Sequence, residues 1–154
     1  MKELQGELYG AGLTIGIVWA RFNEPLVRTA LHACVERLRE LGVTPDSLWV
    51  LRVPGALEIP LALQRLAASG RFSALIALGA VIRGETYHFE VVAMQAAAGI
   101  MQVQLDTGVP IAFGVLTTED KEQALARSGP KNNKGAEAAE AAIEMANLMR
   151  QIQR

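Results

Sequence analysis

The sequence predicts an α/β fold, a three-layer α/β/α sandwich with helices on both faces of a parallel four-stranded sheet. Short apolar runs of strand length alternate along the chain with longer segments in which apolar residues recur every three or four positions. The short runs are almost continuously apolar, which is typical of strands buried on both faces. Right-handed crossovers through the intervening helices place such strands parallel to one another.

Length and composition limit the functional classes. A chain of 154 residues has room for one domain with a substantial core, so we expect a single domain over residues 1–154. The net charge of -1, without a basic stripe or an acidic tail, argues against nucleic acid and anionic membranes as partners. The sequence shows no apolar leader and no apolar run of about 18 residues, so we expect a cytoplasmic protein. Hydrophobic residues make up 51% of the chain, which favours subunit contacts that cover part of them.

The first two strands are expected at residues 13–20 and 48–53, in the runs LTIGIVWA and LWVLRV. Between them, Asn23 can cap a helix, Pro25 suits its first turn and Gly42 suits its end. The turn PGALEIP after the second strand leads into a second helix, which closes at a Ser-Gly dipeptide. This half of the chain therefore reads as strand, helix, strand, helix.

The third and fourth strands are expected at residues 72–82 and 109–116. The turn RGETYHFE separates the third strand from a helix over residues 91–105. Thr117 and Thr118 offer caps for a short helix after the fourth strand, and a Gly-Pro pair closes that helix. The cycle of strand and helix thus repeats to the fourth strand.

An Ala-rich amphipathic helix is expected over residues 136–153, after the loop KNNKG. A segment near Leu8 could add an edge strand to the sheet. Cys34 lies in the apolar pattern of the first helix and is expected to be a small core side chain, with a reactive thiol as the alternative. His32, in the same helix, is expected on the solvent side.

The residues that could carry chemistry follow the ends of the strands, where ligands of parallel sheets bind. Gly84, Glu85 and Thr86 precede the third helix, and the free N–H groups of a helix N-terminus favour an anion such as phosphate. Thr86 could equally be an ordinary helix cap. His88, in the first helical turn, could accept and return a proton, although an isolated histidine is more often a surface residue.

Other strand ends carry further candidates, each with an ordinary structural explanation. Phe22 could be a platform for a flat ring or a hydrophobic staple against the first helix. Glu58 could bind polyhydroxy or amide groups or complement the helix dipole. Arg127 could bind a phosphate or complement a helix C-terminus. Lys131 and Lys134 could be solvated loop charges.

Several common motifs are absent from the sequence. There is no GxGxxG or Walker loop, which disfavours dinucleotides and nucleoside triphosphates. No Cys/His cluster has metal-ligand spacing, and no GxSxG elbow indicates a hydrolase. The residues alone therefore favour a phosphate-binding α/β domain with a histidine at its site.

Five stretches of the sequence make this functional prediction more specific: RFN, VPGALEIP, GAVIRGETYHFE, FGVLTTEDKEQALARSG and NKGAEAAEAAIEMANL. With these stretches in this order, the chain resembles the lumazine synthase family from about residue 8 to residue 148, so the expected fold is flavodoxin-like. That family joins 5-amino-6-(D-ribitylamino)uracil to 3,4-dihydroxy-2-butanone 4-phosphate and releases phosphate and water. The reaction is the penultimate step of riboflavin biosynthesis, and the resemblance implies a transferase without cofactor or metal.

The resemblance also implies roles for individual residues. His88 and Arg127 would be catalytic, with His88 moving protons and the Glu85-Thr86 turn binding the phosphate together with Arg127. Phe22 would stack on the pyrimidine. The ribityl chain would lie against Ala56, Leu57 and Glu58, and main-chain groups of Ala80, Val81 and Ile82 would contact the uracil edge. Phe113, Arg127 and Lys134 would come from the neighbouring subunit.

The family's assembly gives further expectations. Its members form homopentamers, in some cases a hollow icosahedral 60-mer shell, and the short loop SGPKNNKG looks more like that of the shell-forming members. Association with riboflavin synthase is a further expected partnership. Ala80 and Leu57 depart from a common threonine and a frequent aromatic residue. The alternatives are a non-catalytic relative that binds lumazine or flavin, a shell protein, or an unrelated flavodoxin-like phosphate-binding module.

Overall fold

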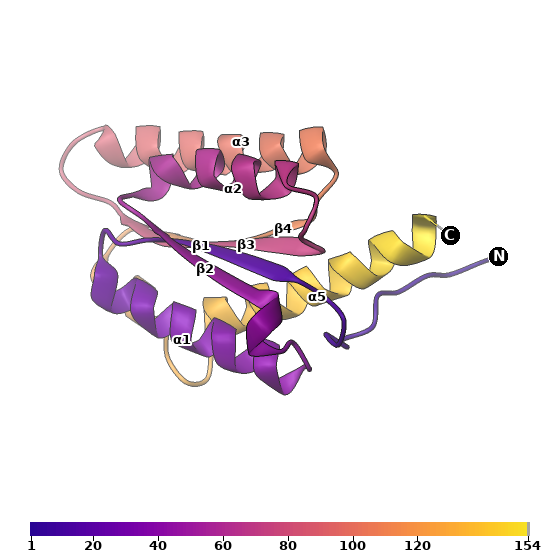
Figure 1. Ribbon diagram of the computed structural model, residues 1–154. Coiled ribbons are helices and arrows are strands. Elements are labelled where there is room, and N and C mark those ends of the chain that lie inside the picture. Colours follow the sequence, from indigo (N-terminus) through magenta and orange to yellow (C-terminus); the bar gives the residue numbers. More distant parts are fainter. Residues whose placement is uncertain (154) are drawn as a thin grey trace.

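A computed structural model describes residues 1–153 of the protein. Four parallel strands form one sheet at its centre (Figure 1). The strands are β1 (Ile15–Ala20), β2 (Leu48–Val53), β3 (Ala74–Ile82) and β4 (Ile111–Thr118), in the spatial order β2-β1-β3-β4. Because the strands are parallel, their carboxyl ends lie together at the same end of the sheet. The parallel four-stranded sheet that the sequence predicts is confirmed.

Helices cover both faces of this sheet, so the three-layer architecture is also confirmed. In Figure 1, α1 (Glu24–Glu40) and α5 (Lys134–Gln153) lie below the sheet, and α2 (Ile59–Ala68) and α3 (His88–Thr107) lie above it. The short helix α4 (Lys121–Ala126) connects β4 to α5. Two turns of 3₁₀ helix, Pro45–Ser47 and Ala56–Glu58, precede β2 and α2 respectively.

Two apolar cores, one on each face of the sheet, hold the layers together. Every residue of β1 is buried, and its side chains alternate between the cores: Ile17 packs on the α1 and α5 side, and Val18 packs on the α2 and α3 side. Cys34 is fully buried in the first of these cores, and burial raises the pKa of its thiol to about 12. The thiol is therefore a core group, as predicted, and His32 is exposed, also as predicted.

The boundaries around β4 correct one prediction. Thr117 and Thr118 belong to the strand, where Thr118 pairs with Ile82 of β3, and they do not cap α4. Their β-branched side chains suit a strand, and pairing with β3 decides their conformation. Asp120 is the cap instead, and its carboxylate accepts a hydrogen bond of 2.8 Å from the Gln123 N–H.

The segment near Leu8 adds no strand to the sheet within the described part of this chain. It runs along α5, where the Asn147 side chain donates hydrogen bonds of 2.6 and 3.0 Å to the carbonyl oxygens of Glu7 and Tyr9. The backbone polar groups that would have paired in a sheet are partly satisfied by this helix. Within residues 1–153, no helix has both the length and the apolar character needed to cross a membrane.

The start of α5 approaches α1 so closely that only glycine fits at position 135. A Cβ atom built there would lie 1.9 Å from the carbonyl oxygen of Ala30. This contact fixes the N-terminal end of α5 against α1, next to the loop that carries Arg127.

We predict that Gly135→Ala lowers the melting temperature, because overpacking such a contact costs roughly 1–3 kcal/mol. Gly129→Ala is the matched control, since the nearest atom to a Cβ atom at Gly129, the carbonyl oxygen of Leu125, would lie 3.7 Å away. Thermal denaturation of both variants checks this. Equal melting temperatures would contradict the close approach at Gly135.

Candidate functional site

The first pocket lies beyond the carboxyl ends of β1, β2 and β3 and has a volume of about 480 Å³. We call it the Phe22 pocket. Here β1 is followed by α1 on one face of the sheet and the adjacent β3 is followed by α3 on the other, which opens a crevice between them. The following predicted site residues line it: Phe22, Ala56, Leu57, Glu58, Ala80, Val81, Ile82, Thr86 and His88.

Backbone and amide hydrogen bonds hold the end of β1 in place. The Phe22 N–H donates to the carbonyl oxygen of Pro54 at 3.2 Å, and the Phe22 side chain remains 71% exposed. Asn23 occupies the N-cap position of α1 in the left-handed conformation, with φ of 63°, but its side chain makes no cap hydrogen bond. Its amide donates instead to the carbonyl oxygen of Ala80 at 3.0 Å. The predicted side-chain cap is therefore wrong, because Asn23 fastens β1 to β3.

The turn after β2 forms another wall of the Phe22 pocket. Residues Ala56–Glu58 make a 3₁₀ turn, closed by a hydrogen bond of 3.2 Å from the Glu58 N–H to the Gly55 carbonyl oxygen. Ala56 is buried beneath the turn, whereas the side chains of Leu57 and Glu58 are exposed. The turn thus presents one apolar and one carboxylate side chain at the pocket.

The turn after β3 brings His88 to the pocket as the first residue of α3. The Thr86 hydroxyl accepts a hydrogen bond of 3.3 Å from the His88 N–H, but Tyr87 occupies the N-cap position of α3, so the interpretation of Thr86 as an ordinary helix cap is wrong. Residues 84–88 are all exposed, which leaves the turn open to a ligand. Glu85 belongs to this exposed turn but does not line the pocket.

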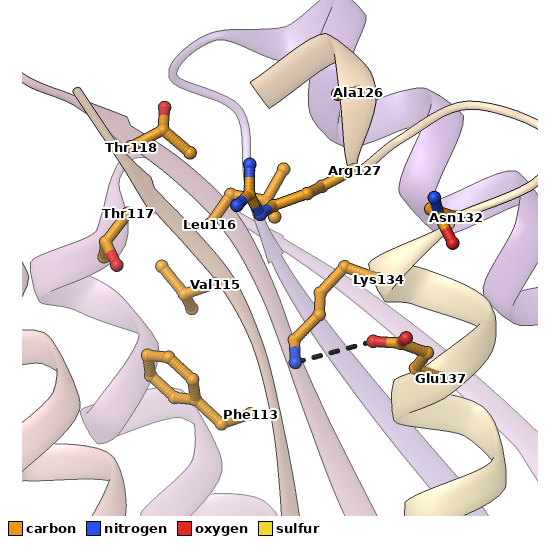
Figure 2. Close-up of a pocket in the computed structure, with 10 residues that line it drawn as sticks. All are labelled: Phe113, Val115, Leu116, Thr117, Thr118, Ala126, Arg127, Asn132, Lys134 and Glu137. Atoms are coloured by element: carbon orange, nitrogen blue, oxygen red, sulfur yellow. Dashed lines mark ion pairs between the residues drawn. The ribbon is translucent and has the colours of Figure 1, made fainter. Parts of the chain in front are cut away.

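The second pocket, which we call the Phe113 pocket, lies between β4, α4 and the start of α5 and has a volume of about 560 Å³ (Figure 2). Phe113 comes from the edge strand β4 and is 38% exposed. The Arg127 guanidinium donates to the Gln123 carbonyl oxygen at 3.1 Å, and the Lys134 ammonium lies 3.6 Å from the Glu137 carboxylate. The pocket therefore offers two cations and one carboxylate beside an aromatic ring.

The two pockets share no lining residue. The structure brings together most of the predicted residues at the Phe22 pocket and places Phe113, Arg127 and Lys134 on a separate surface of the same chain. Sequence reasoning missed other lining residues, namely Phe89 and Val92 in the first pocket and Thr117, Asn132 and Glu137 in the second. The spacing of Lys134 and Glu137 could have indicated their pairing on one helix face.

No group of three or more His, Cys, Asp or Glu side chains within residues 1–153 is arranged to hold a metal ion.

Comparison with known proteins identifies the family. The model of the 6,7-dimethyl-8-ribityllumazine synthase family matches residues 12–150. A protein of that name from Azoarcus sp. is 56% identical over 153 residues, which cover 99% of this chain and 96% of the relative. Proteins of the same name from Paraburkholderia phymatum and Burkholderia cenocepacia are 58% and 59% identical over 146 residues, covering 95% of this chain and 83% and 84% of those relatives.

The chain belongs to the 6,7-dimethyl-8-ribityllumazine synthase family. The resemblance drawn from the five sequence stretches is confirmed. The lumazine synthase family match spans every residue that lines either pocket, so both surfaces lie inside the family domain.

For this lumazine synthase family member, we predict that Asn23→Ala destabilises the protein more than Asn23→Gly does. Both variants lose the hydrogen bond to Ala80, but alanine in the left-handed conformation costs about 1 kcal/mol more. Thermal denaturation under matched conditions checks the order. A more stable Asn23→Ala variant would show that the left-handed conformation at this position is not required.

Proposed function

We propose that the chain forms its active site between adjacent copies, where the Phe22 pocket of one copy meets the Phe113 pocket of the next. The family assignment carries the reaction: the chain condenses 5-amino-6-(D-ribitylamino)uracil with 3,4-dihydroxy-2-butanone 4-phosphate to give 6,7-dimethyl-8-ribityllumazine, phosphate and water. The observation that supports a shared site is the division of the residues between two pockets of one chain.

Two different surfaces that meet in this way make a head-to-tail contact. Repeated by rotation, such a contact closes into a ring in which every chain gives one pocket to each neighbour. A homopentamer is the ring we propose, and the short loop between α4 and α5 favours further assembly into a shell of pentamers.

An apolar stripe on α3 supports assembly independently. Val91, Met94, Ala98, Met101 and Leu105 are exposed and follow one another at steps of three and four residues. The exposed fraction reaches 65% for Met94 and 74% for Leu105. This spacing places the side chains in one seam along the helix, the pattern by which helices pack against other helices. We assign the stripe to contacts with α3 of other copies.

Each pocket has a defined part in the proposed reaction. Phe22 supplies a ring for the pyrimidine to stack on, main-chain groups of Ala80, Val81 and Ile82 contact the uracil edge, and the turn Ala56–Glu58 holds the ribityl chain. The exposed turn at residues 84–86 binds the phosphate together with Arg127 and Lys134 of the neighbouring copy. Phe113 closes over the ring from that copy.

His88 is the proposed proton carrier. The 5-amino group attacks the ketone, and a first water leaves as a Schiff base forms. Phosphate is then eliminated, and the ribitylamino nitrogen closes the ring with loss of a second water. Each step moves a proton. Orientation of the two substrates contributes on the order of 7 kcal/mol or more, against roughly 3 to 5 kcal/mol for acid-base help. The rate therefore depends more on the shape of the two pockets than on one titrating group.

We predict that His88→Ala slows turnover without abolishing it, since substrate orientation survives the substitution. Arg127→Ala should mainly raise the KM for the butanone phosphate, because it removes a phosphate ligand. Steady-state kinetics with each substrate varied in turn measure both effects. A folded but inactive His88→Ala protein would overturn this ranking.

The shared site can be tested by mixing those two variants. If they are unfolded, combined in equal amounts and reassembled, about a quarter of the sites regain an intact pair of pockets in a head-to-tail ring. At low butanone phosphate concentration, activity should therefore exceed the mean of the two separate variants. A site contained within one chain would show no such recovery.

We predict that replacing Met94 and Met101 with glutamate dissociates the assembly, because like charges would meet along the apolar stripe. Light scattering measures the particle mass, and far-UV circular dichroism checks that the chain remains folded. His32→Glu, an exposed substitution on α1, is the control and should leave the mass unchanged.

The alternative function is a non-catalytic relative that binds lumazine or flavin. Incubation of the purified protein with both substrates separates the two, because the lumazine product is fluorescent. Ligand binding without product would support the alternative, and product formation would support the enzyme.

A further inference from the structure

We propose that Arg83 is a positioning residue that fixes the first turn of α3, and with it His88, against the turn between β4 and α4. The proposal rests on the proposed function, because it concerns the same reaction. Arg83 directly follows β3, and its backbone N–H donates to the Thr118 carbonyl oxygen at 2.9 Å. Its side chain therefore starts from a fixed point between the two turns.

The Arg83 guanidinium contacts both turns at once. Its Nη1 pairs with Oε1 of Glu90 in the first turn of α3, and its Nε donates to Oε2 of Glu119, just beyond β4, at 2.5 Å. The guanidinium carbon also lies 4.5 Å from the centre of the Phe89 ring. Phe89 lines the Phe22 pocket and is the next residue after His88.

The contacts continue toward the Phe113 pocket. The Glu119 N–H donates to the Gln123 side-chain oxygen at 2.9 Å, and the Gln123 carbonyl oxygen accepts from Arg127 at 3.1 Å. Arg83 thus lies in a connected set of hydrogen bonds between the two pockets of the chain. Through its neighbours, this side chain influences both the histidine turn and the segment that ends in Arg127.

Two carboxylates already neutralise the Arg83 charge, which argues against Arg83 as a free phosphate ligand. Its hydrogen bonds to Glu90 and then to Glu119 raise the pKa of the guanidinium, and the bond from Arg83 lowers the pKa of the Glu90 carboxyl. A guanidinium can join two carboxylates while its flat face rests on an aromatic ring. Lysine has no such planar fork, so it cannot replace these contacts together.

The test is a kinetic comparison of four variants: Arg83→Gln, Arg83→Lys, Glu119→Gln and the double variant Arg83→Gln/Glu119→Gln. We expect Arg83→Gln to lower kcat about tenfold, since small displacements of a catalytic group have effects of this order. Arg83→Lys should fail to restore the rate. Glu119→Gln should also lower kcat. The double variant should be no slower than Arg83→Gln, because both substitutions break the same contact between Arg83 and Glu119.

Arg37 provides a matched control. Its guanidinium also joins two carboxylates, those of Glu40 and Glu140, but it links α1 to α5 and lines neither pocket. Arg37→Gln should therefore leave both kcat and KM unchanged. If Arg83→Gln changes the melting temperature but not kcat, Arg83 is merely structural and the proposal is wrong.

The variants would behave differently if Arg83 bound the substrate phosphate directly. Glu119→Gln would then release the Arg83 guanidinium and lower the KM for the butanone phosphate, and Arg83→Lys would keep most of the activity. Either result overturns the proposal. If Arg83→Gln fails to fold, Glu119→Gln alone decides through the direction of its effect on kcat. An inactive wild-type protein would overturn the proposed function and this inference together, whereas an active wild type with a neutral Arg83→Gln overturns this inference alone.

Discussion

Burial of the sheet on both faces is the constraint on which the rest of the structure depends. Because helices cover both sides of β1 and β3, neither strand can carry exposed polar chemistry along its length. The polar residues are therefore placed beyond the carboxyl ends of the strands. The Phe22 pocket opens where α1 and α3 leave neighbouring strands toward opposite faces.

The same constraint explains how much of the fold the sequence could predict. A strand buried on both faces requires an almost continuous apolar run, and these runs located all four strands within a few residues. The start of α3 was harder, since no cap side chain marks it: it begins at His88, three residues before the expected start. Thr117 and Thr118 were misassigned because pairing of β4 with β3, a contact distant in sequence, prevailed over their local preference for a helix cap.

The candidate site was predictable in part for the same reason. Phe22, Glu58 and His88 follow strand ends, and the topology of a parallel sheet brings strand ends together without further information. The division into two pockets depends on where α4 and α5 pack, which local patterns do not encode. The role of Asn23 depends on a contact with a residue 57 positions away, and the role of Arg83 requires a contact with a residue 36 positions away, and such pairings carry no local signal.

The N-terminal segment, held along α5 by Asn147 and Gln151, gives the fold a further property. The Gln151 side chain donates to the Gln5 carbonyl oxygen at 2.8 Å, so the two ends of the described chain lie close together (Figure 1). Both lie at the amino ends of the strands, opposite the Phe22 pocket. Neighbouring termini of this kind suit circular permutation: a short peptide could join them, and new ends could be opened in an exposed loop without moving the strand ends that carry the chemistry.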